Sequence, residues 1–205
     1  GDWWWYTVCD DGKIRILLGD ATGHGAGPAM VTAAIGGVYR CVEREQDIPQ
    51  LLTTLNKSLR QACKGDYWMT MSVVEICPQS KTLKWWSAGA PPIFILRKNG
   101  QIETLLESSR PLGSDDSPTL ATFAIPITSG DRLLLFSDGL YEQLTRSGQP
   151  LGLRRLQQWF VEHRDAAIPD LRHRLVEWFE SLREGPLSDD VTLVAIEFMD
   201  QGSPS

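Results

Sequence analysis

Hydrophobic positions change their spacing several times along the chain, and this predicts a mixed fold. Short runs with strand spacing occupy the start and the middle of the chain, where turn-forming residues separate them. The predicted strands are residues 3–9, 13–18, 69–76, 83–88, 93–97, 102–106, 120–125, 132–136 and 191–198. Four further segments have helical spacing or helix-compatible residues. The predicted helices are residues 28–44, 49–62, 153–162 and 169–183.

Two local signals set the connections between the first elements. Asp10, Asp11 and Gly12 supply a turn between the first two strands, since an Asp-Gly pair adopts the positive φ angles that a tight hairpin needs. Pro28 and Pro49 lie in the first turns of the first two helices, where proline is favoured. Strands joined as hairpins, followed by paired helices and then further strands, predict an α+β sandwich of sheets flanked by helices. An alternating parallel α/β fold fits this order poorly.

Length and charge exclude several classes of function. The 205 residues have the length of one large domain, predicted to span residues 1–199, with a disordered tail at residues 200–205. The 20 basic and 26 acidic residues give a net charge of −6, so nucleic acid and direct membrane contact are poor predictions. The four cysteines form no C-x-x-C pair, so a zinc ribbon or a dithiol redox site is not expected.

The chain has no run of 18 apolar residues and no signal-peptide pattern. We therefore expect a cytoplasmic domain, whether free or as the cytoplasmic part of a longer membrane-bound protein. It begins with Gly1 and Asp2, directly before a predicted strand, which suggests a fragment truncated at its N-terminus.

Aspartates stand at the ends of several predicted strands. Asp20 and Asp138 each follow an apolar run, Asp189 and Asp190 precede the last strand, and Asp2 begins the first hairpin. Such a set of carboxylates without a cysteine or histidine cluster suits Mg²⁺ or Mn²⁺ better than zinc. Two such ions that share a carboxylate generate a hydroxide nucleophile and bind a phosphoryl group. Taken one at a time, each aspartate has an alternative role as a turn former or strand cap.

An ordered set of motifs carries a family resemblance over nearly the whole chain. The motifs are residues 1–2 (GD), 20–25 (DATGHG), 87–92 (SAGAPP), 111–113 (PLG), 130–139 (GDRLLLFSDG) and 189–192 (DDVT). In this order the chain resembles the SpoIIE/RsbU-type branch of the metal-dependent protein phosphatases, relatives of protein phosphatase 2C. The resemblance implies a four-layer α-β-β-α sandwich of two mostly antiparallel sheets flanked by helix pairs.

The resemblance also implies an activity. It predicts a Ser/Thr protein phosphatase with two Mn²⁺ or Mg²⁺ ions, in which metal-bound hydroxide attacks phosphoserine or phosphothreonine in bacterial signal transduction. The implied substrate is a regulatory phosphoprotein such as a STAS-type anti-sigma-factor antagonist, and the implied partner within the full-length chain is an upstream sensor or receiver module. Whether the domain forms a homodimer stays open.

Particular positions match the family's metal ligands. By resemblance, Asp20 bridges both ions beside the Ala21 carbonyl, Asp138 and Asp189 complete the first ion's shell, and Asp2 serves the second. The match at Asp190 is weaker. By the same resemblance, glycines let the backbone turn close to the ions, and a threonine supports the Asp189 loop. These residues are Gly23, Gly25, Gly139 and Thr192.

Two positions depart from the family pattern, and one histidine has two readings. Trp5 and Ala90 stand where the family often has Asp and His. They favour the alternative hypothesis of a catalytically weak pseudophosphatase that binds phosphoproteins as a scaffold.

His24 is a candidate general acid, because histidine titrates near neutral pH, or else a structural residue. A third hypothesis is a phosphoesterase that acts on small molecules.

Other catalytic frames are absent from the sequence. The glycine-rich stretch at residues 19–27 matches neither the P-loop nor the dinucleotide-binding pattern. The chain also has no G-x-S-x-G and no H-E-x-x-H motif, so serine hydrolase and zinc protease chemistry are not expected.

Overall fold

Strands and helices follow one another in nearly the order that the hydrophobic pattern predicts. The computed structural model describes residues 1–115 and 121–199. The predicted tail at residues 200–205 lies outside these residues, as does residue 120 at the start of one predicted strand. The described residues fall into two compact units, each with its own sheet and helices. The single domain over residues 1–199 stays a prediction.

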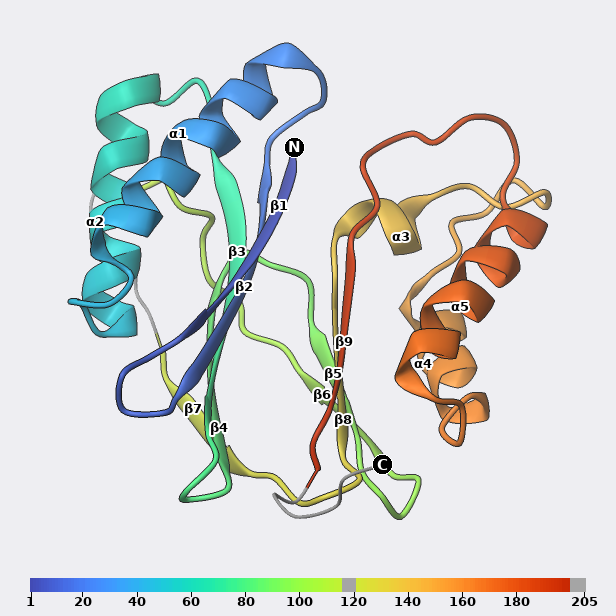
Figure 1. Cartoon of the computed structure of the whole chain (residues 1–205). Helices are drawn as coiled ribbons and strands as arrows, with labels where there is room; N and C mark the ends of the chain where they lie inside the picture. Colours follow the sequence, from blue (N-terminus) through green and yellow to red (C-terminus); the bar gives the residue numbers. More distant parts are fainter. Residues whose placement is uncertain (116–120, 200–205) are drawn as a thin grey trace. The chain divides into compact units, whose positions relative to one another are not determined.

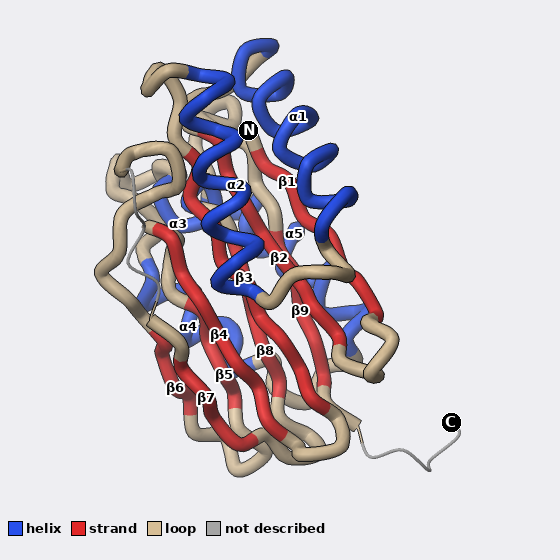
Figure 2. Tube along the Cα trace, turned by 90° about the vertical axis from the view of Figure 1, so that its left-hand side faces the viewer, coloured by secondary structure: helices blue, strands red, loops and turns tan. Residues whose placement is uncertain are grey.

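The first unit consists of Gly1–Pro91 and Leu106–Pro126. Its five-stranded antiparallel sheet has the order β1-β2-β3-β4-β7. The strands are β1 (Asp2–Val8), β2 (Ile14–Ala21), β3 (Met69–Cys77), β4 (Thr82–Ala88) and β7 (Phe123–Pro126). The helices are α1 (Ala26–Val42) and α2 (Ile48–Cys63). Figures 1 and 2 both show this helix pair on one face of the sheet.

The second unit consists of Pro92–Leu105 and the chain from Ile127 onward. Its four-stranded antiparallel sheet has the order β6-β5-β8-β9. The strands are β5 (Ile93–Leu96), β6 (Ile102–Leu105), β8 (Arg132–Phe136) and β9 (Leu193–Glu197). The helices are α3 (Asp138–Glu142), α4 (Leu153–Glu162) and α5 (Ile168–Leu182). The predicted α+β class with two antiparallel sheets is confirmed.

Turn and cap residues explain where the first elements begin and end. Gly12 has φ +79° in the β1–β2 turn, a conformation that glycine adopts at little cost. The Asp47 side chain caps α2 by accepting a hydrogen bond from the Gln50 N–H at 2.9 Å, and Pro49 lies in the first turn. The helix ends at Cys63, and the capping residue Lys64 is left-handed with φ +52°.

Each unit has its own hydrophobic core. In the first, the buried face of α2 packs with α1 and the sheet, and Leu51, Leu55 and Leu59 are at most 1% exposed. In the second, α4 and α5 pack on the β5 and β8 side chains. Figure 1 shows these two helices side by side. The helical spacing read from the sequence therefore marks the faces that are buried.

Several element boundaries differ from the prediction, and one short helix was not predicted. β2 continues to Ala21, so Asp20 lies within the strand. α3 was not predicted, because five residues are too few for a helical period to be recognised. β9 is shorter than the predicted strand at residues 191–198.

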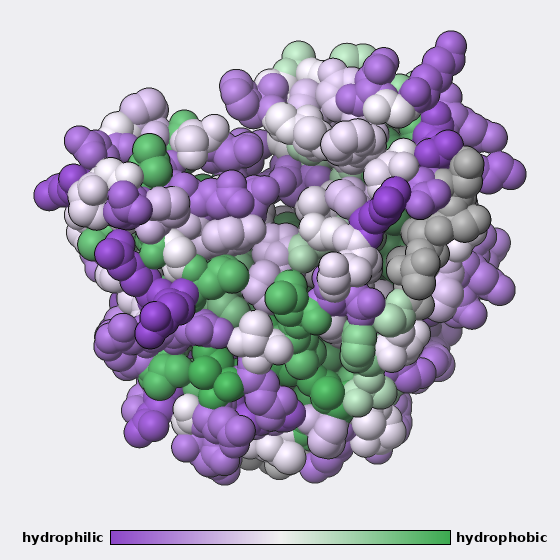
Figure 3. Space-filling model, turned by 180° about the vertical axis from the view of Figure 1, so that it is seen from behind, coloured by the Kyte–Doolittle hydropathy of each residue, from purple (hydrophilic) through white to green (hydrophobic). Residues whose placement is uncertain are grey.

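The face drawn in Figure 3 is mostly polar, and β1 carries exposed aromatic side chains. Hydrophilic side chains predominate on the face drawn in Figure 3, and hydrophobic ones gather in smaller patches. Along β1, Trp3 and Trp5 pack against the first core, whereas Trp4 and Tyr6 are 50% and 58% exposed. No helix in the described part of the chain is long and apolar enough to cross a membrane.

A partly buried cluster of three charged residues joins turns of the second unit. The Arg97 guanidinium donates to both carboxylate oxygens of Glu103, at 2.7 and 3.0 Å, and to Asp131 Oδ2 at 2.8 Å. Asp131 is 1% exposed and also accepts hydrogen bonds from the backbone N–H groups of Thr128 and Lys98. Burial by itself raises the pKa of Asp131, but these three donors outweigh it and lower the pKa.

We expect Asp131→Asn to lower the free energy of unfolding at pH 7 by about 3 kcal/mol, since the change leaves Arg97 without one buried partner. Because the folded-state pKa of Asp131 is lowered, its contribution is present above the unfolded pKa of about 3.9 and is lost as the pH falls below it. Urea unfolding of both proteins between pH 7 and 3 should show the difference shrinking. The exposed Asp165→Asn is the control and should change stability by under about 0.5 kcal/mol. A stability difference between Asp131→Asn and the parent that does not change with pH would contradict a role for the ionised Asp131 carboxylate.

Candidate functional site

Two of the predicted ligands lie directly opposite each other in the first unit. The antiparallel register of β1 and β2 pairs Asp2 with Asp20. Like charges in directly opposite positions of a sheet repel each other. This end of the hairpin therefore holds two carboxylates whose closeness is unfavourable unless positive charge lies near them.

Backbone oxygens converge on the same place. A Cβ atom added to Gly1 would lie 2.6 Å from Asp20 Oδ1, 2.7 Å from the Ala21 carbonyl oxygen and 3.1 Å from the Gly23 carbonyl oxygen. Thr32 of α1 donates a hydrogen bond to the Gly1 carbonyl at 2.8 Å and ties the helix to this end of β1. Thr32 was not predicted as a site residue, because no motif includes it. Only glycine fits at position 1 without displacing these oxygens.

The chemistry of this cluster fits a hard divalent cation. Among the described residues, Asp2 Oδ2 is a buried oxygen atom without a hydrogen-bond partner. A buried polar atom without a partner costs free energy comparable to a lost hydrogen bond. Carboxylate and carbonyl oxygens are the ligands that Mg²⁺ and Mn²⁺ prefer. A cation at this end of β1 and β2 would satisfy Asp2 and offset the repulsion from Asp20.

His24 lies on an exposed loop beside this cluster. Gly23 and Gly25 flank it with φ of +85° and +94°, so the loop turns sharply as the sequence predicts. The His24 side chain is exposed. The loop is fixed instead through Thr22, which exchanges backbone and side-chain hydrogen bonds with Trp68. The role of His24 as a general acid stays a prediction.

The second unit places Asp138 beside the loop that carries Asp189. β8 is buried along its whole length and runs through Ser137 into Asp138, the first residue of α3. Ser137 donates its N–H to the Thr192 carbonyl at 3.0 Å, and its Oγ accepts the Thr192 N–H at 2.9 Å. A Cβ added to Gly139 would collide with the Asp190 carbonyl oxygen and lie 3.4 Å from Asp189 Cβ. These contacts hold the loop close to the end of β8. The role of Gly139 beside the metal ions and that of Thr192 in supporting Asp189 as a ligand stay predictions.

Gln143 holds the same loop and was missed in the sequence. It is 3% exposed, and its amide nitrogen lies 3.4 Å from the carbonyl oxygens of Glu184 and Pro186. Its amide oxygen accepts the Ser188 N–H at 3.1 Å. These partners are more than 40 residues away in sequence, so no local motif identifies Gln143.

The predicted ligands are thus brought together in two pairs. Asp2 and Asp20, with the Ala21 carbonyl, belong to the first unit, and Asp138 and Asp189 belong to the second. Within residues 1–115 and 121–199, no group of three or more His, Cys, Asp or Glu side chains is arranged to hold a metal ion. The complete four-aspartate site therefore stays a prediction.

The two departures from the family pattern have structural roles in the first unit. The Trp5 ring lies under the Arg40 guanidinium of α1, 4.4 Å from the ring centroid, in a cation–π contact. Ala90 is 7% exposed, and its N–H donates to Ser87 Oγ at 3.3 Å. Both residues therefore contribute to packing or to a turn.

Comparison with known proteins identifies the family. The family model described as Stage II sporulation protein E (SpoIIE) matches residues 10–199. The chain belongs to the SpoIIE family. This confirms the resemblance carried by the ordered motifs.

Relatives and solved structures agree with this SpoIIE assignment. Phosphoserine phosphatase RsbP of Bacillus subtilis (strain 168) is 22% identical over 96% of the chain, and phosphoserine phosphatase RsbU of the same organism is 25% identical over 96%. The chain spans 49% of RsbP and 58% of RsbU. The SiaA-PP2C domain of Pseudomonas aeruginosa aligns with a TM-score of 0.83 at 22% identity, covering 96% of the chain and 80% of that domain. This similarity establishes the PP2C-type fold.

We expect Gly139→Ala to destabilise the protein by at least about 2 kcal/mol, because the new methyl group would collide with the Asp190 backbone. Thermal and urea unfolding measure the loss. The matched control is Gly37→Ala, where the added Cβ meets open space within α1 and should raise stability by about 0.5–1 kcal/mol. Equal stability of Gly139→Ala and the parent protein would show that the backbone at Gly139 does not pack closely against the Asp189–Asp190 loop.

Proposed function

We propose that this SpoIIE-family chain is a metal-dependent protein phosphatase domain that hydrolyses phosphoserine or phosphothreonine on a regulatory protein. The observation that carries the proposal is the pairing of Asp2 with Asp20 beside converging backbone oxygens. The printed names of RsbP and RsbU, both phosphoserine phosphatases, support a serine phosphate as substrate. A STAS-type antagonist is the proposed substrate protein, and a regulatory module elsewhere in the full-length protein is the proposed source of control.

Each aspartate has a proposed role. Asp20 would contact both of two Mn²⁺ or Mg²⁺ ions, with the Ala21 carbonyl beside it and Asp2 on the second ion, while Asp138 and Asp189 would hold the first. When bound, such a pair of ions lowers the pKa of a water molecule and neutralises charge on a phosphoryl group. Ser137, Gly139 and Gln143 would keep the second pair of ligands in place through the contacts described above.

The scaffold alternative has less support. Trp5 and Ala90 depart from the family pattern, but Trp5 packs under Arg40 and Ala90 is buried in a turn. With Trp5 and Ala90 at these positions, the chain still has all four candidate aspartates. An active enzyme is therefore the better proposal.

We expect Asp20→Asn and Asp138→Asn each to lower Mn²⁺-dependent turnover of p-nitrophenyl phosphate and of a phosphoserine peptide by at least about 100-fold. The control Asp10→Asn, in the exposed turn, should keep full activity. Circular dichroism verifies that the variants fold. Full activity in either variant would sink the proposal. A folded parent protein that neither turns over substrate nor binds Mn²⁺ in calorimetry would favour the scaffold instead, and a strong preference for small esters would favour the small-molecule phosphoesterase.

The substitution Asp2→Asn tests whether Asp2 is a metal ligand or has only a structural role. Without divalent cation, we expect the variant to be more stable than the parent by a few tenths to about 1 kcal/mol, because the repulsion from Asp20 is removed. With Mn²⁺ at about 100 times its dissociation constant, the parent should gain about 2.7 kcal/mol and the variant clearly less. Asp10→Asn, at the other end of the same hairpin, should behave like the parent in both conditions. An identical Mn²⁺ effect in Asp2→Asn would exclude Asp2 as a ligand.

A further inference from the structure

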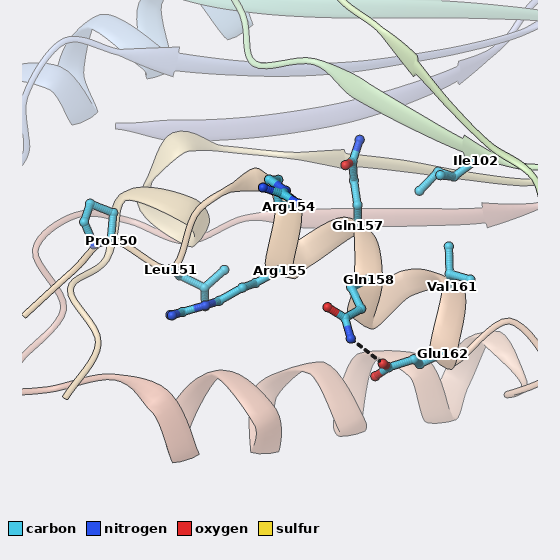
Figure 4. A pocket seen from close by; sticks show the side chains of 9 residues that line it. All are labelled: Ile102, Pro150, Leu151, Arg154, Arg155, Gln157, Gln158, Val161 and Glu162. Carbon is cyan, nitrogen blue, oxygen red and sulfur yellow. Dashed lines mark hydrogen bonds between the residues drawn. The ribbon is translucent and has the colours of Figure 1, made fainter. Parts of the chain in front are cut away.

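A groove in the second unit runs along α4. It has a volume of about 810 Å³ and is drawn in Figure 4. Its lining residues are Ile102, Pro150, Leu151, Arg154, Arg155, Gln157, Gln158, Val161 and Glu162. None of these residues is among the aspartates or the loops that hold them. The groove is therefore a feature separate from the candidate metal ligands.

The floor of the groove is apolar and firmly held. Leu151 is 3% exposed and belongs to the second core, and Ile102 and Val161 pack against that core while remaining partly open. Gln157 donates to Thr104 at 2.6 Å, which ties α4 to β6. Figure 4 shows Arg154 and Gln157 on the side of α4 that faces Ile102. An apolar side chain of a ligand would find a preformed surface here.

Positive charge is concentrated at one end of the groove. Arg155 lines both the groove and an adjoining hollow of about 280 Å³, which Arg146 and the hydroxyl residues Thr145, Ser147 and Ser181 also line. The side chains of Arg146, Arg154 and Arg155 form no ion pair or hydrogen bond with any residue that the structure describes. Arg97, Arg132 and Arg183 of the same unit each pair with a carboxylate, whereas no ion pair is found for the exposed Arg172 and Arg174 of α5 among the described residues.

The positive charge at this end of the groove contrasts with the net negative charge of the chain. The chain carries a net charge of −6, yet Arg146, Arg154 and Arg155 line two adjoining hollows and have no acidic partner among the described residues. The first turn of α4 holds two of them and no acidic residue, which adds to the positive potential at that end. At the other end, Glu162 accepts a hydrogen bond from Gln158 at 2.8 Å. The groove is thus positive at one end and acidic at the other.

We propose that this groove docks an acidic segment of a partner protein. Glutamate or aspartate side chains of the segment pair with Arg146, Arg154 and Arg155, and an apolar side chain packs on Ile102, Leu151 and Val161. A protein segment matches the combination of charged rim and apolar floor, whereas a phosphate backbone or an anionic lipid headgroup would use only the arginines. The site does not depend on the proposed phosphatase activity.

The test uses a fluorescein-labelled octapeptide of six glutamates and two leucines, titrated with the whole chain. We expect saturable binding below about 1 mM, weakened by salt. The double variant Arg154→Gln with Arg155→Gln should bind about tenfold more weakly. The control, Arg172→Gln with Arg174→Gln on α5, removes the same charge from exposed arginines outside the groove and should bind within about twofold of the parent. Amide chemical shifts should change around residues 150–162.

Several outcomes would overturn the proposal. Absence of saturable binding would do so, and so would an equal loss in both double variants, because binding would then follow net charge alone. If a peptide with serine in place of leucine binds equally well, the apolar floor has no part in recognition. Tighter, Arg154-dependent binding of phosphatidylglycerol vesicles or single-stranded DNA would assign the surface to a membrane or to nucleic acid.

Discussion

The register between β1 and β2 determines which side chains of β1 face the first core and which carboxylates lie opposite each other. Because side chains alternate along a strand, a slip of one residue would turn Trp3 and Trp5 away from the α1 side and bring Asp2, Trp4 and Tyr6 to that side instead. The same slip would take Asp2 off Asp20. The packing of these two partly buried tryptophans therefore aligns two carboxylates that repel each other. Core packing and the candidate chemistry are in this way set by one alignment of two strands.

The second unit reaches a comparable result by different means. Asp138 follows a fully buried strand, so its backbone position is set by the core. Asp189 lies on a loop and depends on contacts from distant residues, chiefly Gln143 and Ser137. A strand ladder positions one pair of aspartates, whereas side-chain hydrogen bonds and a close approach at Gly139 position the other. The second pair is consequently the more sensitive to single substitutions nearby.

The sequence predicted the architecture well and the supporting contacts poorly. Alternation and helical spacing located the long elements, and the Asp-Gly turn at residues 11–12 follows from the conformational freedom of glycine. The order of the motifs identified the family and the candidate aspartates. Gln143 and Thr32 were missed because their partners lie far away in sequence, and α3 was missed because it is shorter than two helical turns. Local pattern records burial and turn geometry, but it does not record which distant carbonyl a polar side chain reaches.

The opposed aspartates of the first hairpin also bear on how this protein should be engineered. A library screened for heat resistance in a chelating buffer would favour a neutral residue at position 2, since both the repulsion from Asp20 and the buried Asp2 oxygen without a hydrogen-bond partner would disappear. The variants recovered would be robust proteins that had lost the proposed cation site. Selection with a divalent cation present would reverse that preference, because cation binding would then stabilise the variants that keep the carboxylates.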